Sequence, residues 1–124
     1  QLVQAIHESD HRVALIGGSD ETGAGEALKG ALTVPVVDLV GRATLRETLG
    51  VLSNLQLLVA GDTGVVHLAA GIGTPTFTVF SLKSQSKWSH DESPHRHIRA
   101  PGGDMSKLTF EMLATVLEGL AVRA

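Results

Sequence analysis

The stretch Gly61–Pro75 (GDTGVVHLAAGIGTP) brings together residue types that could bind an anion. An apolar run before it predicts a buried strand, and Asp62, Thr63 and Gly64 form a polar turn that leads into a short helix. The first amides of a helix have no partner within the helix and, with the helix dipole, they favour a phosphate. Thr63 would add a hydroxyl, and His67, on the same helical face, could donate a hydrogen bond to that anion.

The acidic residue of this turn needs a separate explanation. The carboxylate of Asp62 would repel a phosphate, so we expect it to contact another part of a ligand, such as a sugar hydroxyl. Gly61 and Gly64 would let that ligand come close to the main chain. A purely structural interpretation stays open, in which Asp62 only caps the helix and His67 is a core histidine with satisfied hydrogen bonds.

Alternating strands and helices surround this turn. Buried strands are predicted at Arg12–Ile16, Pro35–Leu39, Leu55–Ala60 and Thr76–Phe80, with a short edge strand at His97–Arg99. Helices are predicted at Gln1–Glu8, at Glu21–Ala31, after the capping box of Thr44 and Glu47, and after Ser106 with Leu108, Met112, Val116 and Leu120 on one face. This alternation predicts an α/β fold with a parallel sheet covered by helices on both faces.

Composition narrows the class of protein. The 124 residues suffice for one domain, and 43% hydrophobic with 19% charged residues is typical of a globular protein. A net charge of −3 gives no reason to expect binding to nucleic acid, and the absence of cysteine excludes disulfides and thiolate metal sites. No apolar run approaches the roughly 20 residues of a membrane span. The first residue is not Met and the first residues resemble a helix already under way, so we expect a fragment of a longer protein.

Other chemistries have weaker signals. A cluster of potential metal ligands contains His90, Asp91, Glu92, His95 and His97, but its spacing matches no standard zinc pattern, so no metal is expected. Trp88 could stack on a base or sugar, or anchor its loop to the core. Ser53 and Ser81 have no recognisable base and acid beside them, which disfavours a hydrolase triad.

The turn and three further segments resemble the heptosyltransferase family, glycosyltransferase family 9. DTGVVHLAAGIGTP resembles its most diagnostic motif, Asp-Ser/Thr-Gly-x-x-His-x-Ala-Ala. The other segments occur in the same order as in the family: GGSDE at Gly17–Glu21, VGRATLRETLGVLSN at Val40–Asn54, and RAPGGDMSKLT at Arg99–Thr109. The resemblance covers nearly the whole chain.

The resemblance implies a two-domain GT-B enzyme. Residues 1–124 would form most of its C-terminal, donor-binding domain, a Rossmann-like parallel sheet without its first strand, which leaves a central gap or an exposed edge. The implied reaction is inverting transfer of heptose from ADP-heptose to the lipopolysaccharide inner core, without a cofactor or required metal, in the cytoplasm or at the inner face of the inner membrane. The catalytic base is expected in an N-terminal domain absent from this chain, so the chain alone is expected to be inactive.

The family motif assigns the diphosphate and sugar contacts. Thr63, Gly64 and His67 would hold the diphosphate of the donor. Asp62 would contact the sugar, which explains an acid beside a phosphate site.

The other segments assign the nucleoside contacts. Glu21 would bind the ribose hydroxyls, and Arg42 and Ala43 would line the adenine pocket. Two positions depart from the family: Gly61 replaces a common Asn or Ser, and residues 80–83 (FSLK) replace the usual Gly-Pro-Thr.

Three rival functions remain. A non-catalytic module could bind a nucleotide sugar, and a GT-B transferase or an epimerase could use another donor. A signalling domain like a response regulator would need several acids at strand ends, where only Asp62 and Asp38 are candidates.

Overall fold

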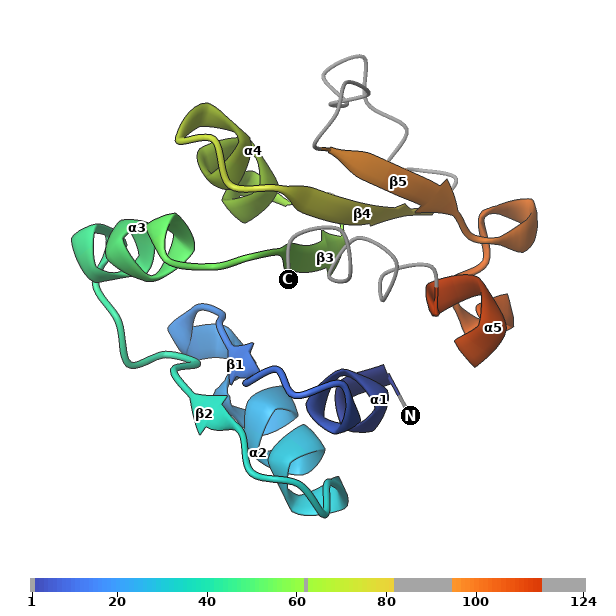
Figure 1. The fold of residues 1–124 in the computed structure, drawn as a ribbon, viewed down its shortest axis with the longest axis horizontal. Helices are drawn as coiled ribbons and strands as arrows, with labels where there is room; N and C mark the ends of the chain where they lie inside the picture. The colour runs from blue at the N-terminus through green and yellow to red at the C-terminus, as the bar shows by residue number, and fades with distance from the viewer. Residues whose placement is uncertain (1, 62, 82–94, 115–124) are drawn as a thin grey trace. The chain divides into compact units, whose positions relative to one another are not determined.

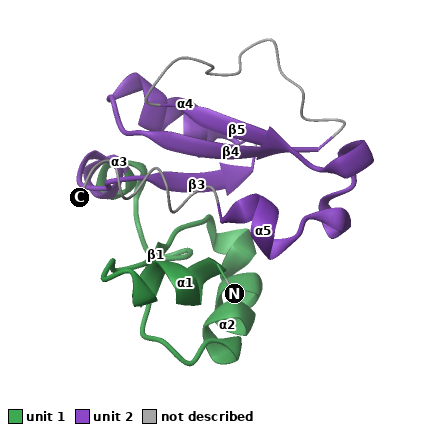
Figure 2. Cartoon of the chain, turned by 45° about the vertical axis from the view of Figure 1, so that its right-hand side comes forward, with its two compact units in different colours: residues 1–48 green, residues 49–124 purple. Residues whose placement is uncertain are grey.

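A computed structural model describes residues 2–61, 63–81 and 95–114 of this chain. It divides the chain into two compact units, Gln1–Thr48 and Leu49–Ala124, which Figure 2 shows in different colours. Each unit contains parallel strands and helices (Figure 1).

The first unit is built around two very short strands. Its elements are α1 (Leu2–Glu8), β1 (Ala14–Leu15), the 3-10 turn η1 (Ser19–Glu21), α2 (Thr22–Ala31) and β2 (Val37–Asp38). β1 and β2 are parallel, with Ala14 opposite Val37. Backbone hydrogen bonds extend this pairing past the strand ends, from the Leu39 amide to the Leu15 carbonyl and from the Gly41 amide to the Gly17 carbonyl, both at 2.9 Å.

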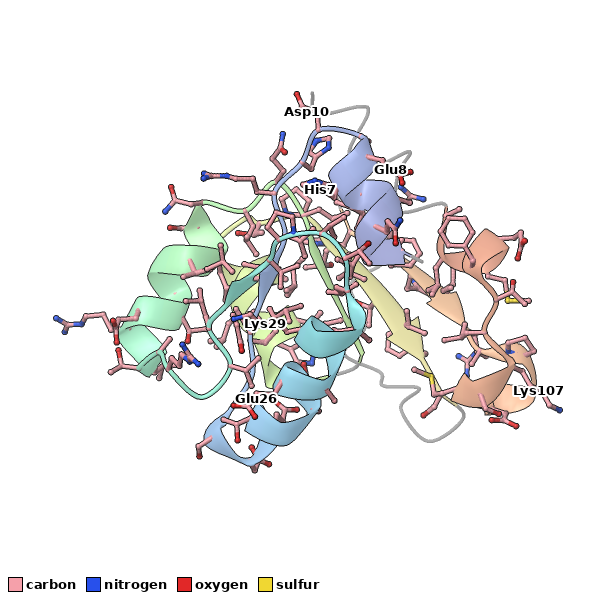
Figure 3. The ribbon with its side chains drawn as sticks, turned by 90° about the horizontal axis from the view of Figure 1, so that it is seen from below. His7, Glu8, Asp10, Glu26, Lys29 and Lys107 are labelled. Atoms are coloured by element: carbon pink, nitrogen blue, oxygen red, sulfur yellow. The ribbon has the colours of Figure 1, made fainter. Side chains whose placement is uncertain are left out.

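A glycine brings α2 close to the segment after β2. Gly25 is the buried residue of α2, and a Cβ at this position would lie 3.0 Å from Cγ2 and 3.1 Å from Cβ of Val40. Val40 is itself buried, so this contact forms part of the small core of the unit. The exposed residues of α2 include Glu26 and Lys29 (Figure 3).

The helix α3 (Leu45–Ser53) begins with the predicted capping box, which the structure confirms. The Glu47 amide donates to Thr44 Oγ1 at 3.1 Å, and the Thr44 amide donates to Glu47 Oε1 at 3.0 Å. The hydrogen bonds from Thr44 hold the pKa of the Glu47 carboxyl below its ordinary value, because they favour its charged form.

The second unit contains the larger sheet. Its further elements are β3 (Leu58–Gly61), α4 (Gly64–Gly71), β4 (Thr76–Phe80), β5 (Arg96–Arg99), the 3-10 turns η3 (Pro101–Gly103) and η4 (Met105–Lys107), and α5 (Phe110–Leu113). The order β3-β4-β5 is all parallel, and α4 packs against β3 and β4. All five residues of β4 are buried, so both faces of this central strand are covered.

The structure confirms the expected α/β fold with parallel strands. The described strands form two separate ladders, β1-β2 and β3-β4-β5, in keeping with the expected central gap or exposed edge. Within residues 2–61, 63–81 and 95–114, no strand pairs with the second edge of β1 or of β3.

The predicted start of the last helix is wrong. Ser106 lies in η4, where Asp104 Oδ1 accepts hydrogen bonds from the Ser106 amide at 3.0 Å and from its hydroxyl at 2.7 Å. Because this local pairing competes with helix capping, α5 begins later and Thr109 caps it through the Met112 amide. Val116 and Leu120 of the predicted helix lie outside the described residues.

None of the helices in the described part of the chain combines the length and the apolar character that crossing a membrane requires.

Candidate functional site

The first group of predicted site residues lies where β3 leads into α4. Thr63 is the N-cap residue, with extended backbone at φ −136° and ψ 168°, and Gly64 begins the helix. The Thr63 side chain makes no capping hydrogen bond to α4, so its hydroxyl is not committed to the helix amides. Asp62 lies outside the described residues, and its predicted contact with a sugar stays a prediction.

The burial pattern of α4 gives the helix two distinct faces. Val66 and Ala69 are buried at 3% and 0% exposure, since this face packs on the sheet. Thr63, Gly64 and His67 are exposed. The exposed position of His67 contradicts the interpretation of this residue as a core histidine and leaves the predicted anion-binding groups on one accessible turn.

The second group of site residues follows the strands of the first unit. Glu21 ends η1, and its carboxylate folds back onto the turn after β1: the Gly18 amide donates to Glu21 Oε2 at 2.9 Å. The Glu21 amide in turn donates to the Gly18 carbonyl at 3.0 Å. Because both ends of the residue are hydrogen-bonded to Gly18, the exposed carboxylate has a defined position.

Arg42 and Ala43 follow β2 in the turn that carries Gly41. Gly41 has a φ of +69°, a conformation that favours glycine, and the Arg42 amide donates to the Leu39 carbonyl at 3.0 Å. Arg42 is exposed and Ala43 is half-buried. The sequence does not predict the left-handed conformation of Gly41, although a glycine that follows an apolar strand is the signal that could have done so.

Asp38 and Ser53, two residues considered for other functions, have structural partners. Asp38 Oδ1 accepts a hydrogen bond from the Val40 amide at 3.1 Å, which commits it to the turn after β2. The Ser53 hydroxyl donates to the Gly50 carbonyl at 2.8 Å within α3. Neither contact is typical of a phosphoacceptor or a nucleophile.

The histidines of β5 and its entry contact the neighbouring strand. His95 Nδ1 lies 2.9 Å from the Thr76 hydroxyl, and the His97 ring meets the Phe80 ring edge-on at 5.4 Å between centroids. The part of the chain that the structure describes contains no group of three potential metal ligands. His90, Asp91 and Glu92 of the predicted cluster, and Trp88 before them, lie outside that part.

The structure therefore gathers the described site residues into two groups, one in each unit. Thr63, Gly64 and His67 follow β3, whereas Glu21, Arg42 and Ala43 follow β1 and β2. Each group lies after the carboxyl ends of parallel strands, which is where open α/β sheets bind ligands. These features define an α/β protein whose predicted site residues lie after the ends of its parallel strands.

The particular family follows from comparison with known proteins. The model of glycosyltransferase family 9 (heptosyltransferase) matches residues 1–110, and the chain belongs to this family.

Curated relatives are heptosyltransferases. Lipopolysaccharide heptosyltransferase 3 of Escherichia coli is 28% identical over 70% of this chain and 26% of its own length. Lipooligosaccharide heptosyltransferase 2 of Haemophilus influenzae is 26% identical over 68% of this chain and 25% of its own length. Lipopolysaccharide heptosyltransferase 1 of E. coli O18:K1:H7 is 25% identical over 100% of this chain and 38% of its own length. The chain thus spans well under half the length of each relative.

Solved structures show the same fold. The E. coli heptosyltransferase WaaC with ADP superposes with a TM-score of 0.74 at 24% identity, covering 94% of this chain and 36% of WaaC. The same enzyme with ADP-2-deoxy-2-fluoro heptose gives a TM-score of 0.75 at 25% identity, covering 94% of this chain and 35% of WaaC.

Proposed function

We propose that residues 1–124 are the donor-binding part of a GT-B heptosyltransferase that transfers heptose from ADP-heptose to the lipopolysaccharide inner core. The observation that carries the proposal is the exposed turn of Thr63, Gly64 and His67 at the start of α4, within a chain that the family model matches over residues 1–110. Similarity to a heptosyltransferase solved with ADP and with an ADP-heptose analogue supports the choice of donor.

The diphosphate is the ligand that the start of α4 suits best. The amides of its first turn and the positive end of its dipole favour negative charge. The uncommitted Thr63 hydroxyl and the exposed His67 ring add donors on the same side. In this proposal Asp62 contacts the heptose, whose hydroxyls can donate to a carboxylate.

The nucleoside would contact the turns of the first unit. Glu21 accepts hydrogen bonds from the ribose hydroxyls, since its carboxylate is exposed and held in place by Gly18. Arg42 and Ala43 line the adenine pocket, where the half-buried Ala43 offers an apolar contact and the exposed Arg42 a planar cation that can stack on the base.

The acceptor side of the reaction belongs to the complete enzyme. The lipopolysaccharide core is the proposed acceptor, and the catalytic base is proposed to come from another domain. The proposal includes a cytoplasmic location, with peripheral contact to the inner membrane made by the complete protein, and it requires no cofactor.

Calorimetric titration tests the donor assignment. ADP is titrated into the longest natural polypeptide that contains residues 1–124, with UDP as the matched nucleotide. We expect ADP to bind and UDP to show no detectable binding. Preference for UDP would overturn the assignment of an adenine donor, and failure to bind either nucleotide would contradict a nucleotide-sugar site in this polypeptide.

A further inference from the structure

One of the two carboxylate oxygens of Glu21 is anchored by a hydrogen bond. Its Oε2 accepts the hydrogen bond from the Gly18 amide, and among the described residues its Oε1 accepts none. A carboxylate anchored through one oxygen presents the other in a fixed direction, which a freely rotating exposed glutamate does not. The direction of Oε1 therefore depends on the space beside Gly17 that lets Oε2 reach the Gly18 amide.

That space exists because residue 17 has no side chain. A Cβ built on Gly17 would overlap Glu21 Oε2, and it would lie 3.4 Å from Glu21 Cβ and 3.3 Å from Val40 Cγ1. Gly17 is exposed and its φ does not require glycine, so backbone strain does not explain a glycine here, and a Cβ would meet both the carboxylate and the buried Val40 side chain. The contact with the carboxylate is the tightest one that a larger residue would make.

The backbone around Gly17 is held on both sides. Its carbonyl accepts the hydrogen bond from the Gly41 amide at 2.9 Å, and the Gly18 carbonyl accepts one from the Glu21 amide at 3.0 Å. The turn at Gly41 packs closely on the segment Ser19–Thr22, since a Cβ there would lie 2.6 Å from Thr22 Cγ2 and 3.2 Å from the Ser19 Cα. A side chain at position 17 would therefore displace the end of the Glu21 side chain rather than the main chain.

We propose that Gly17 is a positioning residue of the ribose subsite. By leaving room for the Glu21 carboxylate against the Gly18 amide, it directs Oε1 toward the ribose 2′- and 3′-hydroxyls and makes the site prefer ribose over 2′-deoxyribose. This inference rests on the proposed function, which assigns Glu21 to the ribose. It predicts that Gly17→Ala harms ribose recognition while the fold stays intact.

The binding test compares ADP with 2′-deoxy-ADP in the longest natural polypeptide that contains residues 1–124. The parent is expected to bind ADP about tenfold more tightly or better, as a hydrogen bond to a carboxylate predicts. Glu21→Ala and Gly17→Ala should each reduce this preference to within about twofold, and the double variant should match Glu21→Ala because Gly17 acts through Glu21. Gly23→Ala is the matched control, since a Cβ there meets nothing within 4 Å.

A ligand-free measurement separates the position of the Glu21 carboxylate from its contact with ribose. In the parent background, Glu21→Ala should move the amide resonance of Gly18, because it removes the hydrogen bond to Glu21 Oε2. In the Gly17→Ala background the same substitution should leave that resonance in place, while the melting temperature of Gly17→Ala stays within about 2 °C of the parent. A Gly18 resonance that still responds to Glu21→Ala in the Gly17→Ala background, or a parental ribose preference in Gly17→Ala, would overturn the role of Gly17. If instead Glu21→Ala keeps the preference, or the parent binds neither nucleotide, the proposed function of Glu21 fails and the ribose role of Gly17 fails with it.

Discussion

His67 is the residue whose role can be tested most directly. It is exposed on the first turns of α4, one helical turn after Thr63, and we propose that it donates a hydrogen bond to the donor diphosphate. His67→Ala should weaken ADP binding by about 1.5–3 kcal/mol, the range for a hydrogen bond to a charged group. Titration calorimetry of the longest natural polypeptide measures this loss.

Two control variants separate this role from an effect on the helix. His67→Gln keeps an N–H donor and should retain part of the lost affinity. Gly71→Ala changes the far end of α4, where a Cβ meets nothing within 4 Å, and should leave ADP binding unchanged. Parental affinity in His67→Ala would remove His67 from the site.

At the scale of single residues, the sequence predicts which residues share a helical face better than it predicts their tertiary contacts. The spacing of Thr63 and His67 is sufficient to place both on one helical face, because that face follows from the period of the helix. The contacts of Gly17 and Gly41 are not predictable in the same way. They depend on a φ of +69° and on pairing between strands that lie more than 20 residues apart in the chain.

Two glycines of the helix α2, Gly25 and Gly30, differ in what a side chain would meet. A Cβ at Gly25 would press on Val40, whereas a Cβ at Gly30 meets nothing within 4 Å. Gly30→Ala should raise the free energy of unfolding by about 0.5–1 kcal/mol, because alanine favours the helix. Gly25→Ala should lower it by about 1 kcal/mol, since overpacking against a β-branched side chain outweighs that gain.

Urea unfolding followed by circular dichroism compares the two variants. The decisive result is whether the free energy of unfolding falls in Gly25→Ala and rises in Gly30→Ala. If both substitutions stabilise the protein equally, α2 does not pack closely on the segment after β2.

The capping box of α3 predicts a dependence of stability on pH. The folded-state pKa of Glu47 lies below its ordinary value of 4.5, so its charged form stabilises the folded state. The stabilisation should be fully present above pH 4.5 and disappear as the pH falls through the lowered pKa. Glu47→Gln retains a capping partner without a charge. Its stability relative to the parent should therefore rise as the pH falls from 4.5 through the lowered pKa of Glu47.

Two further variants complete this measurement by urea unfolding at several pH values. Thr44→Ala removes the N-cap and should cost about 1 kcal/mol. Glu26→Gln removes an exposed charge on α2 and controls for the general loss of one carboxylate (Figure 3). A Glu47→Gln difference that does not change with pH would contradict the proposed cause.

The elements show where prediction from sequence succeeds and where it fails. The capping box and the strand Thr76–Phe80 are confirmed because their signals are local and strong. The helix start at Ser106 is wrong because the Ser106 amide and hydroxyl both donate to Asp104 Oδ1, which places Ser106 inside a 3-10 turn capped by Asp104 and not at the start of a helix. The division of the strands into two ladders depends on pairing partners, which a local pattern does not identify.

At the scale of the whole chain, the buried apolar residues are unevenly divided. In the part of the chain that the structure describes, Val40 is the buried hydrophobic residue of the first unit, whereas eight others belong to the second: Leu52, Leu58, Val66, Ala69, Phe77, Val79, Phe80 and Ala100. Burial of apolar area is the main favourable term in folding, so the second unit has the larger share of the stability. The turns proposed to hold the nucleoside belong to the less stable unit.

Amide hydrogen exchange of residues 1–124 should reveal this imbalance. The amides of β4 should exchange most slowly, since the strand is central and buried along its length, and those of β1 and β2 should exchange much faster. If the nucleoside binds the turns after β1 and β2, ADP should slow exchange there far more than in β4, because a ligand stabilises most the part whose opening it prevents. UDP serves as the control nucleotide and should leave both regions unchanged. Uniform exchange across the two units would contradict their unequal stability, and protection by ADP confined to the second unit would contradict the nucleoside contacts assigned to Glu21, Arg42 and Ala43.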